Sequence, residues 1–146
     1  MSPHAAERTV VLTMRFLAAA FAVTGVLFLV TPDGVISTID DVGDRLGSFS
    51  EGPDSDQKLW VALSFGYMTV IAGVALVVSI DVARHRPLLL VLAAGKLASS
   101  LPAGAFFVLD DDVFAYLLTF VVDGSLVAVS LACWVLAGRV REVAAT

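Results

Sequence analysis

Two opposite charges stand inside long apolar stretches of the sequence, and they are the residues best suited to chemistry. Lys96 lies in "AAGKLASSLPAG", and Asp123 lies in a later apolar stretch. On a helix, Ser99 and Ser100 share a face with Lys96, because they follow it by three and four positions. An ammonium, a carboxylate and two hydroxyls can bind an ion, move a proton or hold a polar ligand. Ionisable groups within a membrane mark such sites or pair with one another.

Lys96 and Asp123 are expected to meet, because they lie at similar depths on consecutive antiparallel helices. At about 1.5 Å per residue, Lys96 lies roughly 18 to 20 Å from the outer end of its helix, and Asp123 roughly 14 to 16 Å from the outer end of the next. A lysine side chain can bridge that difference. We therefore predict an ion pair inside a bundle, with Ser99 and Ser100 completing a buried polar cluster. The pair is either a functional site or an electroneutral contact that only fixes helix register, and both interpretations stay open.

Other chemistry finds little support in the sequence. His4 and His85 lie outside the apolar stretches, which argues against haem or di-iron ligation within a membrane. The single cysteine, Cys133, excludes an intramolecular disulfide. The acidic segments lack the spacing of an EF-hand, and no basic tract suits nucleic acid. We predict no metal site, no cofactor, no nucleic-acid partner and no catalytic residue, so the sequence favours a non-enzymatic protein.

Four apolar segments must position these residues. Apolar residues make up 58% of the chain and charged residues 16%, and the charges cluster between the apolar segments. About 20 apolar residues are enough to cross the hydrocarbon core of a bilayer. We predict an all-α integral membrane protein, a four-helix bundle that forms one domain over residues 1–146. The predicted spans are about 9–30, 59–80, 87–109 and 113–136.

The outer loop between the first two spans, 31–58, is predicted to contain an amphipathic helix. Apolar residues recur there at spacings of three and four, and charged residues occupy the other side. A helix with two such faces suits a membrane surface or the end of a bundle. The apolar positions are Val35, Ile39, Val42, Leu46 and Phe49, and the charged ones are Asp40, Asp41, Asp44 and Arg45.

The basic residues predict the orientation of the chain. With four spans, both chain ends and the link between the second and third spans share one side, and they contain six of the nine Lys and Arg residues. By the positive-inside rule, we expect both termini in the cytoplasm of a multi-pass plasma membrane protein. A composition rich in Ala, Val, Asp and Arg is typical of a prokaryote. The six residues are Arg8, Arg15, Arg84, Arg86, Arg139 and Arg141.

Small residues are predicted to form the helix contacts. Helices in lipid associate through close backbone approach, which glycine and alanine allow. Besides the lipid bilayer, we expect partners of the same kind, namely other membrane subunits or further copies of the chain. The predicted packing positions are Ala18, Ala22, Gly25, Gly66, Gly73, Gly95 and Gly104.

The segment "RFLAAAFAVTGVLFLVTPDG" and the four-span layout resemble bacterial membrane proteins of the DoxX-like kind. In that family a first helix begins near an arginine, ends before a proline, and is followed by three short-linked spans. The segments "GKLASS" and "VVDG" are also similar to uncharacterised four-span bacterial proteins. The DoxX-like resemblance implies an accessory membrane subunit linked to quinone-dependent redox complexes.

Three functions follow from these observations as hypotheses. The first is a non-enzymatic accessory or assembly subunit of a membrane complex, which packs through its small-residue faces. The second is a small transporter or channel whose polar site within the membrane is Lys96 with Asp123. The third, which follows from the resemblance alone, is a redox-complex subunit that contacts quinone or another lipid.

Overall fold

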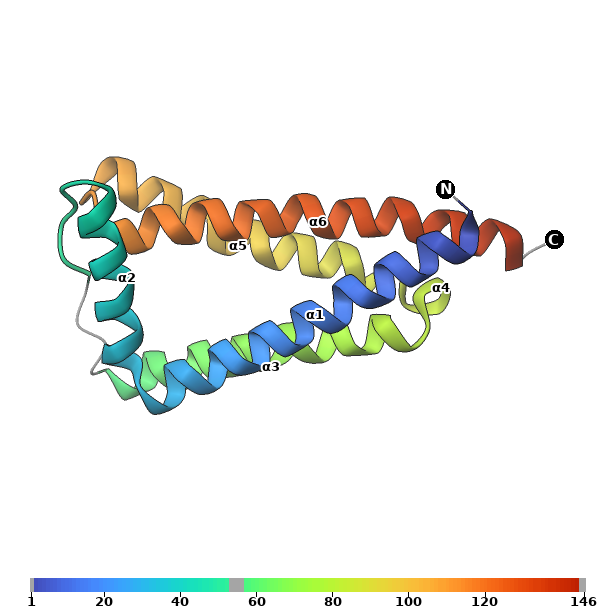
Figure 1. Cartoon of the computed structure of the whole chain (residues 1–146), viewed down its shortest axis with the longest axis horizontal. Helices are drawn as coiled ribbons and strands as arrows, with labels where there is room; N and C mark the ends of the chain where they lie inside the picture. The colour runs from blue at the N-terminus through green and yellow to red at the C-terminus, as the bar shows by residue number, and fades with distance from the viewer. Residues whose placement is uncertain (1, 53–56, 145–146) are drawn as a thin grey trace.

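The computed structural model describes residues 2–52 and 57–144, and these residues form six α-helices (Figure 1). The four longest helices are long and apolar enough to cross a membrane. The prediction of an all-helical chain with four candidate spans is therefore confirmed. The long helices are α1 (Pro3–Val30), α3 (Lys58–Ile80), α5 (Leu88–Leu109) and α6 (Phe114–Ala144), and the short ones are α2 (Pro32–Leu46) and α4 (Val82–His85).

Two of the long helices extend beyond the predicted spans, at the end of the bundle that holds both termini. The helix α1 begins at Pro3, where the Ser2 hydroxyl accepts a hydrogen bond from the Ala5 N–H at 3.3 Å. A proline in the first turn suits a helix start, because its missing N–H would have no helical partner there. Hydropathy detects only the apolar part of such a helix, so its polar first turns were not expected.

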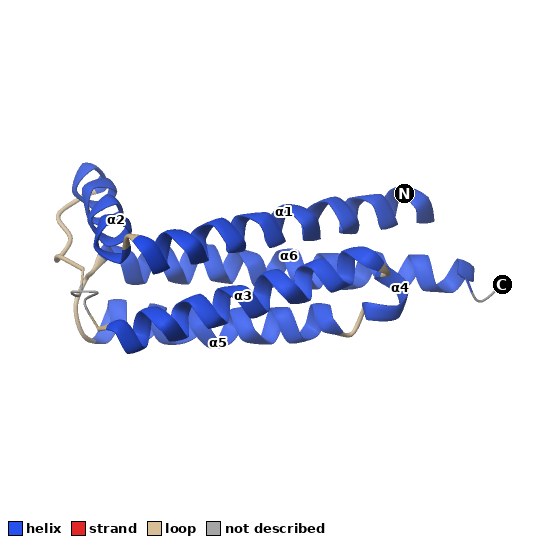
Figure 2. Cartoon of the chain, turned by 90° about the horizontal axis from the view of Figure 1, so that it is seen from below, coloured by secondary structure: helices blue, strands red, loops and turns tan. Residues whose placement is uncertain are grey.

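The long helices form two pairs, α1 with α3 and α5 with α6. The pairs lie together near the termini and α4, and they separate toward α2 (Figure 1). Both termini lie at the same end, and α2 crosses the opposite end in both views (Figure 1 and Figure 2). Because the pairs diverge, the space between them is widest beside α2.

The apolar core lies in the half of the bundle near the termini. All four long helices contribute to it, together with Val82 of α4. Ser130 lies in this region with 0% exposure, and its hydroxyl has no hydrogen-bond partner among the described residues. The core side chains are Val10, Met14, Leu17, Ala18, Ile71, Ala75, Val78, Val82, Leu89, Leu92, Cys133 and Ala137.

The helix α2 turns only part of the predicted apolar stripe toward the bundle. Val35 and Ile39 face the space between the helix pairs, and Gly43 is buried next along the same stripe. Val42 and Leu46 are 42% and 70% exposed, so they do not take part in this contact with the bundle, and the predicted place of the helix at a membrane surface stays a prediction. A stripe at successive i+4 positions follows one side of a helix, so Val35, Ile39 and Gly43 face the same way.

Close packing against α6 leaves no room for a side chain at position 43. A Cβ at Gly43 would lie 2.8 Å from the Cβ of Phe114, so only glycine lets α2 approach the start of α6. Phe49, beyond the end of α2, packs against the Phe114 ring with centroids 5.2 Å apart. The Ser50 hydroxyl donates to the Asp112 carboxylate at 2.8 Å. These contacts fasten the outer loop to the α5–α6 turn.

Some predicted small-residue positions are true contact points between helices. Ala18 is 3% exposed within the core. A Cβ at Gly25 would lie 3.2 Å from the Cβ of Met68 on α3, and one at Gly104 would lie 2.7 Å from the Cδ2 of Phe120 on α6. The two glycines therefore mark close approach within the α1/α3 pair and the α5/α6 pair.

Other predicted small-residue positions make no such contact within this chain. A Cβ at Gly66 or Gly73 would have no described atom within 4 Å, and Ala22 is exposed. At Gly95 the nearest described atom would be the Tyr67 hydroxyl, at 3.9 Å. Gly66 and Gly73 therefore make no close helix contact within the described part of this chain, because their side of α3 faces outward, and their packing against another helix stays a prediction.

Candidate functional site

Lys96 and Asp123 form an ion pair between α5 and α6. The Lys96 Nζ donates to Asp123 Oδ1 at 2.9 Å, and the two residues are 2% and 8% exposed. The pair lies where the depth comparison along the two helices predicted it. If these helices crossed a membrane, an unpaired charge here would cost about 2.5 to 3.5 kcal/mol on insertion scales, and the pairing would offset that cost for each residue.

Hydroxyl groups complete the surroundings of the carboxylate. Ser99 donates to Asp123 Oδ2, so both carboxylate oxygens have partners. The Tyr67 hydroxyl on α3 donates to the Gly95 carbonyl at 3.1 Å and lies 3.5 Å from the Ser99 hydroxyl. This chain of contacts links α3, α5 and α6 around one buried negative charge.

Ser100 has a different role from Ser99. Its hydroxyl donates to the Phe120 carbonyl at 2.9 Å, whereas the Ser99 hydroxyl donates to the carboxylate of the ion pair. A Cβ at Gly124 would lie 3.3 Å from the Ser100 hydroxyl, so Ser100 sits against the surface of α6. Ser100 joins the two helices through the backbone of α6 and not through the charged site.

Aromatic rings enclose the ammonium. The Lys96 Nζ lies 4.2 Å from the centroid of the Phe21 ring and 5.2 Å from that of the Tyr67 ring. The negative face of an aromatic ring attracts a cation, most strongly where water is excluded. Asp123 supplies the one oxygen acceptor for Lys96 Nζ among the described residues. The ammonium therefore has N–H groups left to donate to another molecule.

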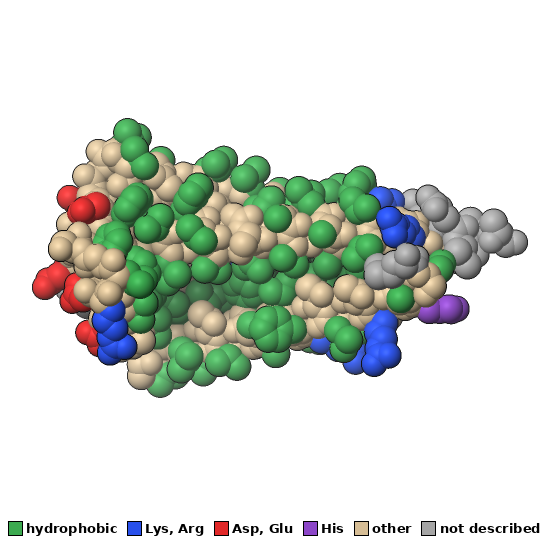
Figure 3. All heavy atoms as spheres, turned by 45° about the horizontal axis from the view of Figure 1, so that its top comes forward, with side chains coloured by type: hydrophobic (Ala, Val, Ile, Leu, Met, Phe, Trp, Pro, Cys, Tyr) green, Lys and Arg blue, Asp and Glu red, His purple; other side chains and the backbone are tan. Residues whose placement is uncertain are grey.

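The pair forms part of the wall of an apolar cavity. The cavity has a volume of about 550 Å³ and lies between the two helix pairs on the α2 side. Figure 3 shows a hollow lined by hydrophobic side chains on this face. Small-molecule sites typically have volumes of about 300 to 1,000 Å³ and apolar walls with a few polar groups. The polar groups here are Tyr67, Lys96, Ser99, Asp123, Thr24 and Thr119.

Two residues of the site were not predicted from the sequence. Phe21 and Tyr67 come from α1 and α3, and no charge or spacing ties them to Lys96 in the sequence. Tyr67 carries a weak signal, because a phenol is unusual inside an apolar segment. Phe21 carries none, since phenylalanine is an ordinary residue of a membrane helix.

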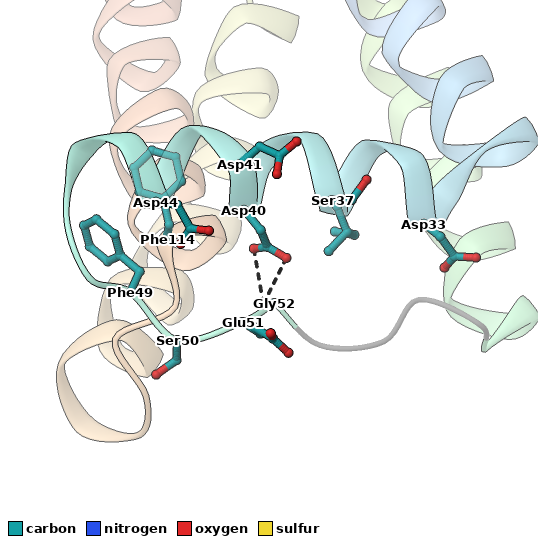
Figure 4. A pocket seen from close by; sticks show the side chains of 11 residues that line it. Asp33, Ser37, Asp40, Asp41, Asp44, Phe49, Ser50, Glu51, Gly52 and Phe114 are labelled. Atoms are coloured by element: carbon teal, nitrogen blue, oxygen red, sulfur yellow. Dashed lines mark hydrogen bonds between the residues drawn. The ribbon is translucent and has the colours of Figure 1, made fainter.

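A second cavity, of about 380 Å³, lies at the acidic end of the molecule. Asp40, Asp41 and Asp44 of α2 lie around it, and the Asp40 carboxylate accepts the Gly52 N–H at 3.2 Å from each oxygen (Figure 4). Among the side chains that the structure describes, in residues 2–52 and 57–140, no group of three or more His, Cys, Asp or Glu is placed to hold a metal ion. The aspartates form an acidic rim on the outer side of α2.

Comparison of the chain with protein-family models, with curated proteins and with solved structures found no match. The resemblance to DoxX-like proteins stays a prediction from the sequence.

Proposed function

We propose that the chain is a multi-pass membrane protein that binds a membrane-soluble ligand beside the Lys96–Asp123 pair. The observation that carries the proposal is the position of that pair in the wall of an apolar cavity. A pair that only fixed helix register could be packed on all sides. Here the ammonium lies at a cavity large enough for a small molecule, and it has N–H groups that are not used by Asp123.

The cavity favours a ligand with a large apolar part and a hydrogen-bond acceptor. Its lining is mostly aliphatic and aromatic, which suits a hydrocarbon chain or ring. Both oxygens of the Asp123 carboxylate already have partners. The polar group of the ligand would therefore accept a hydrogen bond from the Lys96 ammonium. A carbonyl oxygen is the matching group, and quinones and ester-linked lipids both carry one.

The rim of the cavity supports entry from the side of the bundle. Phe16 on α1 and Val122 on α6 both line the cavity, and they are 72% and 44% exposed. Helices α1 and α6 would thus flank an opening toward the lipid. The inner stripe of α2, Val35 and Ile39, covers the end of the cavity, with α2 lying along the membrane surface.

The charges at the two ends of the bundle support a membrane orientation. Acidic side chains gather at the α2 end, with some basic side chains beside them, and other Lys or Arg side chains and a histidine lie toward the end with the termini (Figure 3). We infer that the termini lie in the cytoplasm and that the membrane is the plasma membrane of a prokaryote. Attachment of a membrane-impermeant maleimide to a Ser48→Cys variant, but not to a His4→Cys variant, would support this orientation. The reverse pattern would contradict it.

A continuous path for transport is less well supported. Fully buried side chains such as Met14, Val78 and Leu89 fill the bundle between the cavity and the end with the termini. A transporter or channel would have to open this core in a second conformation. Flux of a polar solute into liposomes that contain the purified protein would support the transport hypothesis instead.

The binding hypothesis is tested by filling the cavity. Val122→Trp should reduce binding of decylubiquinone to purified protein in detergent at least about ten-fold, because Val122 lines the cavity. Val121→Trp is the matched control, since this neighbouring residue is 56% exposed and does not line the cavity. Mass spectrometry of solvent extracts would show whether either variant retains a cellular lipid or quinone. Equal binding by both variants would contradict the proposal.

A second candidate is the accessory or assembly subunit predicted from the sequence. Gly66 and Gly73 lie on an outward side of α3 with open space beside them, which suits close approach by another membrane helix. Gly66→Leu with Gly73→Leu should then remove a cross-linked partner or second copy, and Val70→Leu should not. Retention of the same partners by the double variant would contradict this role for α3.

A further inference from the structure

A third cavity lies at the basic end of the molecule, away from the Lys96–Asp123 site. Its volume is about 420 Å³, and its walls combine two arginines with an apolar strip. Arg84 and Arg86 belong to the segment that joins α3 to α5, and Leu90 and Trp134 come from α5 and α6. Charged and apolar groups meet here at the level where a membrane helix would leave the lipid.

Arg86 is held in one position by α6. Its Nε donates to the Trp134 carbonyl at 2.9 Å, and its guanidinium carbon lies 4.1 Å from the centroid of the Trp134 ring. A Cβ at Gly138 would lie 3.0 Å from Nη2, so a glycine makes room for the guanidinium. Because Nε already donates to the Trp134 carbonyl and Arg86 lines the cavity, the two terminal nitrogens are the donors that remain for a ligand there.

No described carboxylate pairs with either arginine. Among the side chains that the structure describes, in residues 2–52 and 57–140, neither Arg84 nor Arg86 forms an ion pair with Asp or Glu. Asp81 lies close in sequence, but its side chain accepts the backbone N–H of Arg84 at 2.9 Å and caps α4. A fixed guanidinium with free terminal donors, beside a second arginine, favours an anion with several oxygens.

We propose that this cavity binds the phosphate group of an anionic phospholipid. Arg84 and Arg86 bind the phosphate oxygens, and the exposed side of Leu90 and the Trp134 ring contact the upper part of an acyl chain. Basic pockets between membrane helices bind anionic head groups by the same combination of charge and apolar contact. The inference rests on the proposed membrane location, and it does not depend on a ligand in the Lys96 cavity.

Tryptophan fluorescence provides a local test. Trp60→Phe leaves Trp134 as the one tryptophan of the chain. In bilayer nanodiscs, brominated phosphatidylglycerol diluted into phosphatidylcholine should quench Trp134 far more than brominated phosphatidylcholine at the same content. Arg84→Gln with Arg86→Gln should lower that preference about ten-fold, because both phosphate ligands are removed.

A matched pair of arginines separates this site from general attraction to the membrane. Arg8→Gln with Arg139→Gln removes the same charge from the same end, but neither residue lines the cavity. This control should change the preference less than about two-fold, within the range of general surface attraction. Equal losses in the two double variants, or no preference in the parent, would overturn the proposal.

Two further measurements test Arg84 by itself and distinguish a phospholipid from free phosphate. Arg84→Gln alone should lower the preference and leave packing intact, because the hydrogen bond and the ring contact with α6 are made by Arg86. A full preference in this variant would overturn the role of Arg84 as a phosphate ligand. Relief of quenching by inorganic phosphate, but not by sodium chloride at equal ionic strength, would assign the site to free phosphate and overturn the lipid. Stronger quenching by phosphatidylglycerol that persists in both salts supports a phospholipid site.

Discussion

The two halves of the bundle use the same four helices in different ways. Near the termini, α1, α3, α5 and α6 share one apolar core whose side chains are almost completely buried. Near α2, the same helices form two separate pairs with an apolar cavity between them. The ion pair lies at the cavity. The comparison indicates that packing in one half holds the helices together, which leaves the other half free to enclose a polar site.

Breaking the ion pair should have the largest effect on this arrangement. Lys96→Met or Asp123→Leu alone should lower the free energy of unfolding by about 3 to 5 kcal/mol, because each leaves the other charge buried and unpaired. The double variant should recover most of that loss. Equilibrium unfolding with sodium dodecyl sulfate in mixed micelles measures all three.

The double variant also separates the two interpretations of the pair. Recovered stability together with lost binding of decylubiquinone would favour a ligand site. Recovered stability with unchanged binding would leave the pair a purely structural contact between α5 and α6. Single variants as stable as the parent would contradict the burial of the pair in a low-dielectric bundle.

Removing equal apolar side chains from the two halves tests the comparison directly. Leu89→Ala, at a fully buried core position, should cost about 2 to 5 kcal/mol through lost contacts and an empty volume. Leu118→Ala, in the cavity wall, should cost less, because it enlarges an existing space. The same unfolding measurement applies to both. Equal costs would show that the cavity half is packed as tightly as the core.

Two glycine substitutions test how α2 closes the open half. Gly43→Ala should destabilise the protein by about 1 to 3 kcal/mol, because the new Cβ would lie 2.8 Å from the Cβ of Phe114. Gly66→Ala, with open space around it, should be neutral or stabilise the helix by up to about 1 kcal/mol. Thermal unfolding in detergent distinguishes them. A stable Gly43→Ala variant would show that α2 can lift away from α6 at little cost.

The smallest expected effect concerns a buried hydroxyl within the tight half. The Ser130 hydroxyl is buried without a partner among the described residues. Ser130→Ala should therefore raise the free energy of unfolding by about 1 kcal/mol, since it removes an unsatisfied polar group. Val129→Ala on the same helix is a control that should not stabilise. A destabilised Ser130→Ala variant would reveal a hydrogen bond that the hydroxyl makes in the folded protein.

The sequence predicted the helices well, because long apolar segments have few alternatives in a membrane. It also predicted the meeting of Lys96 and Asp123, because a short turn ties the depths of two consecutive helices together. The sequence could not show which side of an apolar helix faces protein. Gly66 and Gly73 look like packing residues in the sequence, yet they lie on the outside of α3.

The remaining parts of the site depend on contacts that are distant along the chain. Phe21 and Tyr67 reach the ammonium only because α1 and α3 pack beside α5 and α6. Hydrophobic periodicity could not show which residue of α2 approaches α6 most closely, because that contact is made by Gly43, which has no apolar side chain. Tertiary packing, rather than local pattern, decides such positions.

The separation of Lys96 and Asp123 along the chain has a consequence for biosynthesis. The lysine precedes its partner by 27 residues. In the membrane location proposed above, a ribosome that adds about 5 to 20 residues per second would deliver α5 to the bilayer at least a second before the compensating carboxylate. A helix that carries an unpaired lysine inserts into a bilayer less favourably than an apolar helix. We therefore expect α5 and α6 to enter the bilayer together, as one helical hairpin.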